Sequence, residues 1–175
     1  QNAGLDDEAD VWRHWVGYQP PDIHKALVAR SLFRVWNAGP EYNLERLSRR
    51  GDALAFAQCQ ARFVDEVMEL ACCWNERYVP AFKWRAAQFG RLPLCPLAVR
   101  EGIEKMVGAE ERAALAQGGQ VVESIKLPMK DLYHLPQRLD EPLSSYAYAV
   151  HASIEDEAVR EATHLLAEGV ASAED

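Results

Sequence analysis

Apolar residues recur at intervals of three and four along most of the chain, whereas the strict alternation that marks strands is nearly absent. Proline, glycine and capping residues divide this pattern into predicted helices. The expected spans are about 6–16, 20–38, 41–50, 52–77, 80–90, 97–107, 110–116, 120–127 and 142–168. The adjacent Gly118 and Gly119 are expected to break the helical pattern. The sequence therefore predicts an all-α fold.

The segment 52–77 is predicted to be the longest helix, with Asp52 as its cap, and to lie centrally in the fold. Its apolar seam consists of Phe56, Cys59, Phe63, Val67, Leu70 and Trp74, and the seam is widened on one flank by Val64, Met68 and Ala71. A stripe this wide is typical of a helix packed on two sides, as in a bundle. We therefore expect a single-domain, up-and-down helical bundle with additional short helices, spanning 1–175 with its core at about 10–168.

Charge is distributed unevenly along the chain. The formal net charge is -8, which argues against general nucleic-acid binding. The segment 77–100 nevertheless contains five cations (Arg77, Lys83, Arg85, Arg91, Arg100) and no acid. A basic segment in an acidic protein indicates a small anionic ligand or an acidic partner. The alternative is that these cations pair with the acidic ends of the chain.

Several other chemistries are not expected from this sequence. The four cysteines lack Cys-x-x-Cys spacing and the five histidines lack His-x-x-x-His spacing, so we expect no metal and no cofactor. No apolar run approaches 18 residues, so no membrane association is expected, and the cysteines are interpreted as buried thiols of a cytoplasmic protein. Because the sequence begins with Gln1 rather than Met, we expect either a piece of a longer protein or a processed start.

The corner after the long helix is the principal candidate site. Asn75 falls on an apolar flank, so its side chain needs a partner, which is either a ligand or the end of its own helix. Lys83 falls in the first turn of the next predicted helix, where a cation opposes the helix dipole unless an anion binds there. Arg77 and Tyr78 add donors to the same corner. Trp84 is expected to belong to the core.

A second candidate lies on the helix predicted at 41–50. Asn43, Arg46 and Arg50 recur on one helical face, and such a face suits phosphate or carboxylate recognition. The alternative is a solvated basic face. Asn43 and Arg46 are predicted to converge with Asn75, Arg77, Tyr78 and Lys83 on one partly open, concave ligand-binding site.

A series of short motifs carries a resemblance to a known family. The motif residues are Tyr18, Pro20, Pro21, Asp22 and Ile23, then Tyr42, Asn43 and Arg46, then Arg50, Gly51 and Asp52, then Asn75, Arg77, Tyr78, Pro80, Lys83 and Trp84, then Leu92 and Pro93, and finally Ile154, Asp156 and Arg160. In this order they resemble the helical domain of unknown function that follows the catalytic core in a group of bacterial nucleotidyltransferase-like proteins. The resemblance spans about 10–160 and implies a bundle like the substrate-binding domains of kanamycin-type nucleotidyltransferases. It also implies that the chain is the C-terminal part of a longer nucleotidyltransferase-like protein.

The catalytic half of that family is absent from this sequence. The family's core carries a Gly-Ser turn followed by an Asp-x-Asp pair for metal, and neither the turn nor a strand-borne pair occurs here. We therefore expect no catalysis from this chain alone. The resemblance implies a substrate-binding or accessory domain that holds an anionic small molecule at the basic corner. The alternative is an interaction module that docks on an acidic partner surface, for example that of a nucleotidyltransferase catalytic domain.

Overall fold

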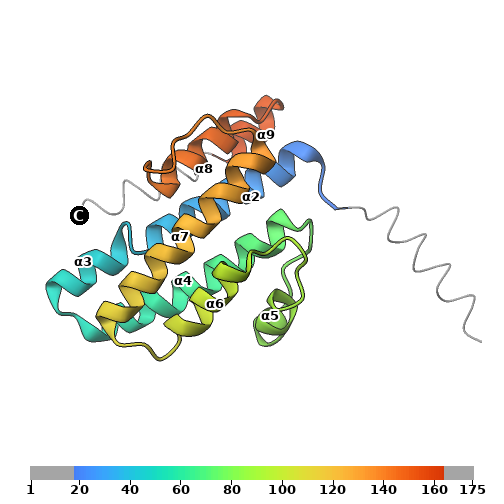
Figure 1. The fold of residues 1–175 in the computed structure, drawn as a ribbon. Coiled ribbons are helices and arrows are strands. Elements are labelled where there is room, and N and C mark those ends of the chain that lie inside the picture. Colours follow the sequence, from blue (N-terminus) through green and yellow to red (C-terminus); the bar gives the residue numbers. More distant parts are fainter. Residues whose placement is uncertain (1–17, 164–175) are drawn as a thin grey trace, which may run out of the picture.

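The computed structural model describes residues 18–163, and all regular structure within this range is helical (Figure 1). The helices are α2 (Pro21–Ala38), α3 (Asn43–Arg50), α4 (Ala53–Trp74), α5 (Phe82–Phe89), α6 (Leu97–Met106), α7 (Glu111–Tyr133), α8 (Leu143–Ala152) and α9 (Glu157–Ala162). The all-α prediction is confirmed for these residues. The helix predicted at 6–16 lies outside the described part of the chain.

The core is formed where the long helices pack side by side (Figure 1). Helix α2 packs against α4 on one side and α8 on another, and α6 packs along α7. Phe63, Val67 and Leu70 of the predicted seam are fully buried against this core, and Cys59 is half-buried. Helix α4 packs mainly against α2, with α3 and α5 as further neighbours, and its seam supplies apolar residues to the core.

Several helix boundaries that were predicted from local capping residues agree with the structure. Gly51 ends α3 in the left-handed conformation (φ 70°), which glycine adopts without steric penalty. Asp52 begins α4 as predicted, since its Oδ1 accepts the N–H of Ala55 at 3.0 Å. The end of α4 differs from the prediction, because the helix stops at Trp74 rather than at about 77. Asn75 caps it, and Glu76 then adopts a left-handed conformation (φ 53°) that ends the helix.

The predicted break at Gly118 and Gly119 is wrong. Helix α7 runs without interruption for 23 residues, so it is longer than the 22-residue α4 that was predicted to be the longest. A Cβ on Gly118 would lie 3.3 Å from Pro40 and 3.4 Å from Met106, so glycine here allows other segments to approach the helix closely. Gly118 is therefore explained by close packing and not by a break in the helix.

The helix predicted at 142–168 is also interrupted. Helix α8 ends at Ala152, and Asp156 starts α9 by accepting the N–H groups of Ala158 and Val159 on its side chain. The N–H of Asp156 donates to Oδ2 of Asp22 at 2.8 Å, which ties this break to the start of α2. A capping carboxylate and a long-range hydrogen bond therefore outweigh the helical pattern of the sequence.

Candidate functional site

Helix α5 forms an outlying element beside the C-terminal half of α4 (Figure 1). Ion pairs and a buried apolar side chain attach it to the bundle. Nη1 of Arg85 lies 2.5 Å from Oδ2 of Asp65 and 2.9 Å from Oε1 of Glu69, and the Arg85 side chain is only 11% exposed. Phe89 is buried on the same face of α5, one turn later. Arg85 and Phe89 therefore define the side of α5 that faces the bundle.

The five cations of the segment 77–100 divide into two groups. Arg85 is held by carboxylates, and Arg100 donates to the carbonyl oxygens of Gly90 and Leu92. Arg77, Lys83 and Arg91 are exposed, and no carboxylate of residues 18–163 forms an ion pair with them. Internal pairing thus explains Arg85, through acids of α4 rather than of the chain ends. Arg77 and Lys83 have no carboxylate partner within residues 18–163, and their pairing with acids at 6–10 or beyond 163 stays a prediction, because those acids lie outside the described residues.

Two aromatic side chains stand on the outer surface of α5. Phe82 is 78% exposed and Trp84 is 61% exposed, and Nζ of Lys83 lies 5.7 Å from the Trp84 ring. The expectation that Trp84 belongs to the core is therefore wrong. An eight-residue helix buries one face, and Arg85 and Phe89 already occupy that face.

Asn75 serves the architecture of the corner. Its Nδ2 donates to the carbonyl of Ala71 at 2.7 Å, and its Oδ1 accepts the N–H of Leu94 at 2.9 Å. The capping alternative is thus confirmed for Asn75. Tyr78 is largely exposed, and its ring packs against Tyr18 with the ring centroids 5.5 Å apart.

The predicted convergence of all six residues is wrong. Nδ2 of Asn43 donates to Oδ1 of Asn37 at 2.9 Å, near the C-terminal end of α2. That end lies beside Cys59, whose thiol contacts the carbonyl of Ala38. Asn75 lies 16 residues farther along α4, or about 24 Å at 1.5 Å per residue. Asn43 is therefore far from Asn75, because the two residues lie near opposite ends of α4.

Arg46 belongs to the same remote group as Asn43. Its guanidinium carbon lies 4.2 Å from the centroid of the Tyr42 ring, and Tyr42 stacks on Trp36 at 4.5 Å. The arginine is exposed, as is Arg50. This arrangement matches the alternative of a solvated basic face, in which Arg46 covers an aromatic pair.

The sequence did not reveal a cavity of about 460 Å³ at the end of the bundle. Its lining residues come from α2, from the end of α4, from the turn before α6 and from the end of α7: His24, Trp74, Asn75, Glu76, Leu94, Leu132 and Tyr133. Nε2 of His24 lies 3.0 Å from the carbonyl oxygen of Cys73 and 3.4 Å from the Tyr133 hydroxyl. No local motif joins these residues, so only folding brings them together.

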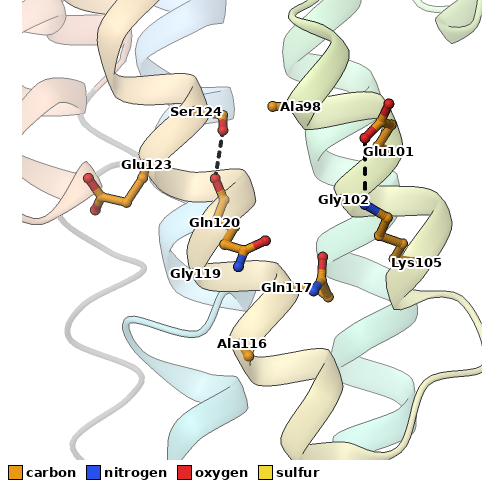
Figure 2. Close-up of a pocket in the computed structure, with 10 residues that line it drawn as sticks. All are labelled: Ala98, Glu101, Gly102, Lys105, Ala116, Gln117, Gly119, Gln120, Glu123 and Ser124. Carbon is orange, nitrogen blue, oxygen red and sulfur yellow. Dashed lines mark hydrogen bonds and ion pairs between the residues drawn. The ribbon is translucent and has the colours of Figure 1, made fainter.

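Two further hollows lie on other faces. A groove of about 620 Å³ lies between α6 and α7. Figure 2 shows Glu101 paired to Lys105 on one wall and Gln117 and Gln120 on the other. The depth of the groove is limited by close helix packing, since a Cβ on Gly102 would lie 2.4 Å from Val121. The second hollow, of about 540 Å³, is mainly apolar and lies between α4, α5 and the loop after α6.

Residues 18–163 contain neither a metal-binding cluster nor a membrane-spanning helix. No group of histidine, cysteine and carboxylate side chains in this range has an arrangement that could hold a metal ion. None of the described helices is long and apolar enough to span a bilayer. Burial raises the pKa of the Cys72 thiol to about 11, and the Cys73 and Cys95 thiols are also raised by burial, so these groups are protonated and unreactive near neutral pH.

Comparison with known proteins adds one finding. A family described as a domain of unknown function, DUF4037, matches residues 4–85. The matched region, just under half of the chain, includes α2, α3, α4 and the first half of α5. No curated protein and no solved structure matches the chain.

Proposed function

We propose that this chain is a non-catalytic accessory module that docks on an acidic surface of a partner protein through its α5 corner. The α5 corner comprises Arg77 in the turn after α4 and Phe82, Lys83 and Trp84 at the start of α5. The observation that carries the proposal is the exposure of Phe82 and Trp84 on either side of a lysine that has no carboxylate partner among the described residues. Exposed aromatic side chains next to cations are characteristic of protein-binding surfaces.

The surroundings of the corner support a protein partner. Phe82 forms one wall of the apolar hollow of about 540 Å³, together with Val64, Met68 and Val107. A partner side chain that entered this hollow would bury apolar surface, while Lys83 and Arg77 would meet acidic groups at its margin. Charge complementarity of this kind mainly raises the association rate and sets the orientation of the partners.

The resemblance to nucleotidyltransferase-associated helical domains supports a choice of partner. The proposed partner is a nucleotidyltransferase-like catalytic domain encoded with this chain. In that arrangement the catalytic carboxylates are supplied by the partner, which accounts for the lack of a Gly-Ser and Asp-x-Asp core in this sequence.

The test is titration calorimetry between this chain and that catalytic domain, expressed separately. Phe82→Ser should weaken binding about tenfold or more, and Lys83→Glu should weaken it and reduce its dependence on salt. Leu54→Ser is the matched control, because Leu54 is 73% exposed but lies at the far end of α4. Equal effects of Phe82→Ser and Leu54→Ser, or no effect of either corner variant, would refute docking through α5.

A small anionic ligand at the same corner is the second candidate. Lys83 lies in the first turn of α5, and no side chain caps that turn. Free N–H groups and a lysine together favour a phosphate or carboxylate group. This candidate ranks second because none of the described hollows is lined by Arg77 or Lys83. In titrations with phosphate, pyrophosphate and nucleotides, Lys83→Ala should weaken binding by about 1.5–3 kcal/mol and leave the melting temperature nearly unchanged. If no anion stabilises the wild type, this candidate is excluded.

A further inference from the structure

The cavity of about 460 Å³ lies where three long helices terminate at one end of the bundle. Figure 1 shows the start of α2 and the ends of α4 and α7 meeting there. The cavity differs from the α5 corner in its lining, because neither Arg77 nor Lys83 lines it. Its chemistry is instead set by one carboxylate and several aromatic rings.

Glu76 provides the carboxylate. It lines the cavity and its backbone has a φ of 53°, which is uncommon for a residue with a side chain. No hydrogen bond or ion pair joins its carboxylate to any residue in the range 18–163. Burial raises the pKa of Tyr133 and of Tyr18, and the negative charge of Glu76 raises both further. The carboxylate is therefore close enough to both phenols to act on them electrostatically.

Aromatic side chains lie in and beside the same cavity. The rings of His24 and Tyr133 lie 6.2 Å apart, those of Tyr18 and His24 lie 5.3 Å apart, and Trp74 forms a further wall. The faces of the Tyr133 and Trp74 rings carry partial negative charge, and such faces attract cations. The indole Nε1 of Trp74 is buried and has no hydrogen-bond partner among the described residues.

The helix ends add to the negative potential at this end of the bundle. Helix α4 ends at Trp74 and α7 ends at Tyr133, and both C-termini carry partial negative charge. The N-terminus of α2 begins at the same end and offsets one of them. The net contribution of the helix ends therefore has the same sign as the charge of Glu76.

We propose that this cavity binds an organic cation, with an ammonium group held by the carboxylate of Glu76 and the faces of the surrounding rings. The apolar side chains of Leu94 and Leu132 complete the walls and would contact the carbon skeleton of the ligand. An anion is disfavoured at this position, because it would face Glu76.

The test is a nuclear magnetic resonance titration of the whole chain with choline, following the indole N–H resonance of Trp74, which is assigned with Trp74→Phe. Choline should shift this resonance saturably in the millimolar range, and the neutral carbon isostere of choline should bind about tenfold more weakly or not at all. Inorganic phosphate should not shift it. No saturable shift with choline, or equal binding of the isostere, would overturn the proposal.

Variants of the carboxylate give the second part of the test. Glu76→Gln keeps the shape of the side chain and should weaken choline binding about tenfold. Glu76→Gly also removes the carboxylate and suits the left-handed backbone, so it should lose binding without losing stability. Glu104→Gln is the control, since Glu104 is an exposed carboxylate on α6. Unchanged binding in both Glu76 variants would overturn the proposal even if choline binds the wild type.

Discussion

Arg85→Met should release α5 from the bundle without unfolding the bundle itself. The substitution keeps an unbranched apolar stem and removes the guanidinium that binds Asp65 at 2.5 Å and Glu69 at 2.9 Å. Each charge-assisted hydrogen bond contributes about 1.5–3 kcal/mol. Both carboxylates are partly exposed and regain water when the pair is broken, and Glu69 keeps Arg34 at 3.6 Å. The net loss in the attachment of α5 should therefore be about 2–3 kcal/mol.

Native-state hydrogen exchange measures this loss segment by segment. A loss of about 2–3 kcal/mol should lower the protection of α5 amides about 30- to 150-fold. Protection in α2, α4 and α7 should stay near the wild-type value, because α5 packs mainly on the surface of α4. Docking of the catalytic domain through the α5 corner should weaken in parallel.

Arg91→Met is the matched control for this experiment. Arg91 belongs to the same basic segment and is exposed, without a carboxylate partner among the described residues, so its removal should leave α5 protection unchanged. A loss of less than about threefold in Arg85→Met would show that the two ion pairs do not hold α5. An equal loss in every helix would show that α5 is not a separate cooperative unit.

Two further predictions concern the bundle. Lys126→Met should destabilise the fold by about 2–4 kcal/mol in urea denaturation. The Lys126 side chain is 2% exposed and its Nζ lies 2.9 Å from Oε1 of Glu41, so the substitution leaves that carboxylate without a cation. A loss below about 1 kcal/mol would contradict this reasoning. The N–H of Asp156 holds the pKa of Asp22 below its ordinary value, so the stability contributed by Asp22 is complete above the unfolded pKa of about 3.9 and is lost as pH falls through the lower folded pKa. Urea midpoints measured from neutral to acid pH should therefore fall less steeply in Asp22→Asn than in the wild type, and identical profiles would exclude this role of Asp22.

Features governed by neighbouring residues were predictable from the sequence. The start of α2 after Pro20, the end of α3 at Gly51 and the capping of α4 by Asp52 all depend on backbone preferences or hydrogen bonds within a few residues. The seam of α4 was predictable for a related reason, since helical spacing alone places its apolar residues on one face. The capping alternative for Asn75 was predictable for the same reason, because an amide near a helix end has backbone groups within reach.

Features that depend on contacts between distant segments were decided by the tertiary structure. Gly118 reads locally as a helix breaker, yet Pro40 and Met106 approach it so closely that glycine is what the packing of α7 requires. Trp84 reads as a core residue, yet the burial of Arg85 and Phe89 turns it toward solvent. These outcomes depend on which elements meet, and sequence spacing does not encode that information.

The candidate sites divide in the same way. The sequence alone determined that the segment 77–100 is basic and free of acid, because charge is a property of composition. Only the fold decided that Arg85 turns inward to α4, that Lys83 stays outside, and that Asn43 lies near the end of α2 beside Cys59, which is about 24 Å from Asn75 along α4. Only the fold assembled Glu76, His24 and Tyr133 around one cavity. The physical reason is that side-chain chemistry is carried by each residue, whereas distance and burial are properties of the packed helices.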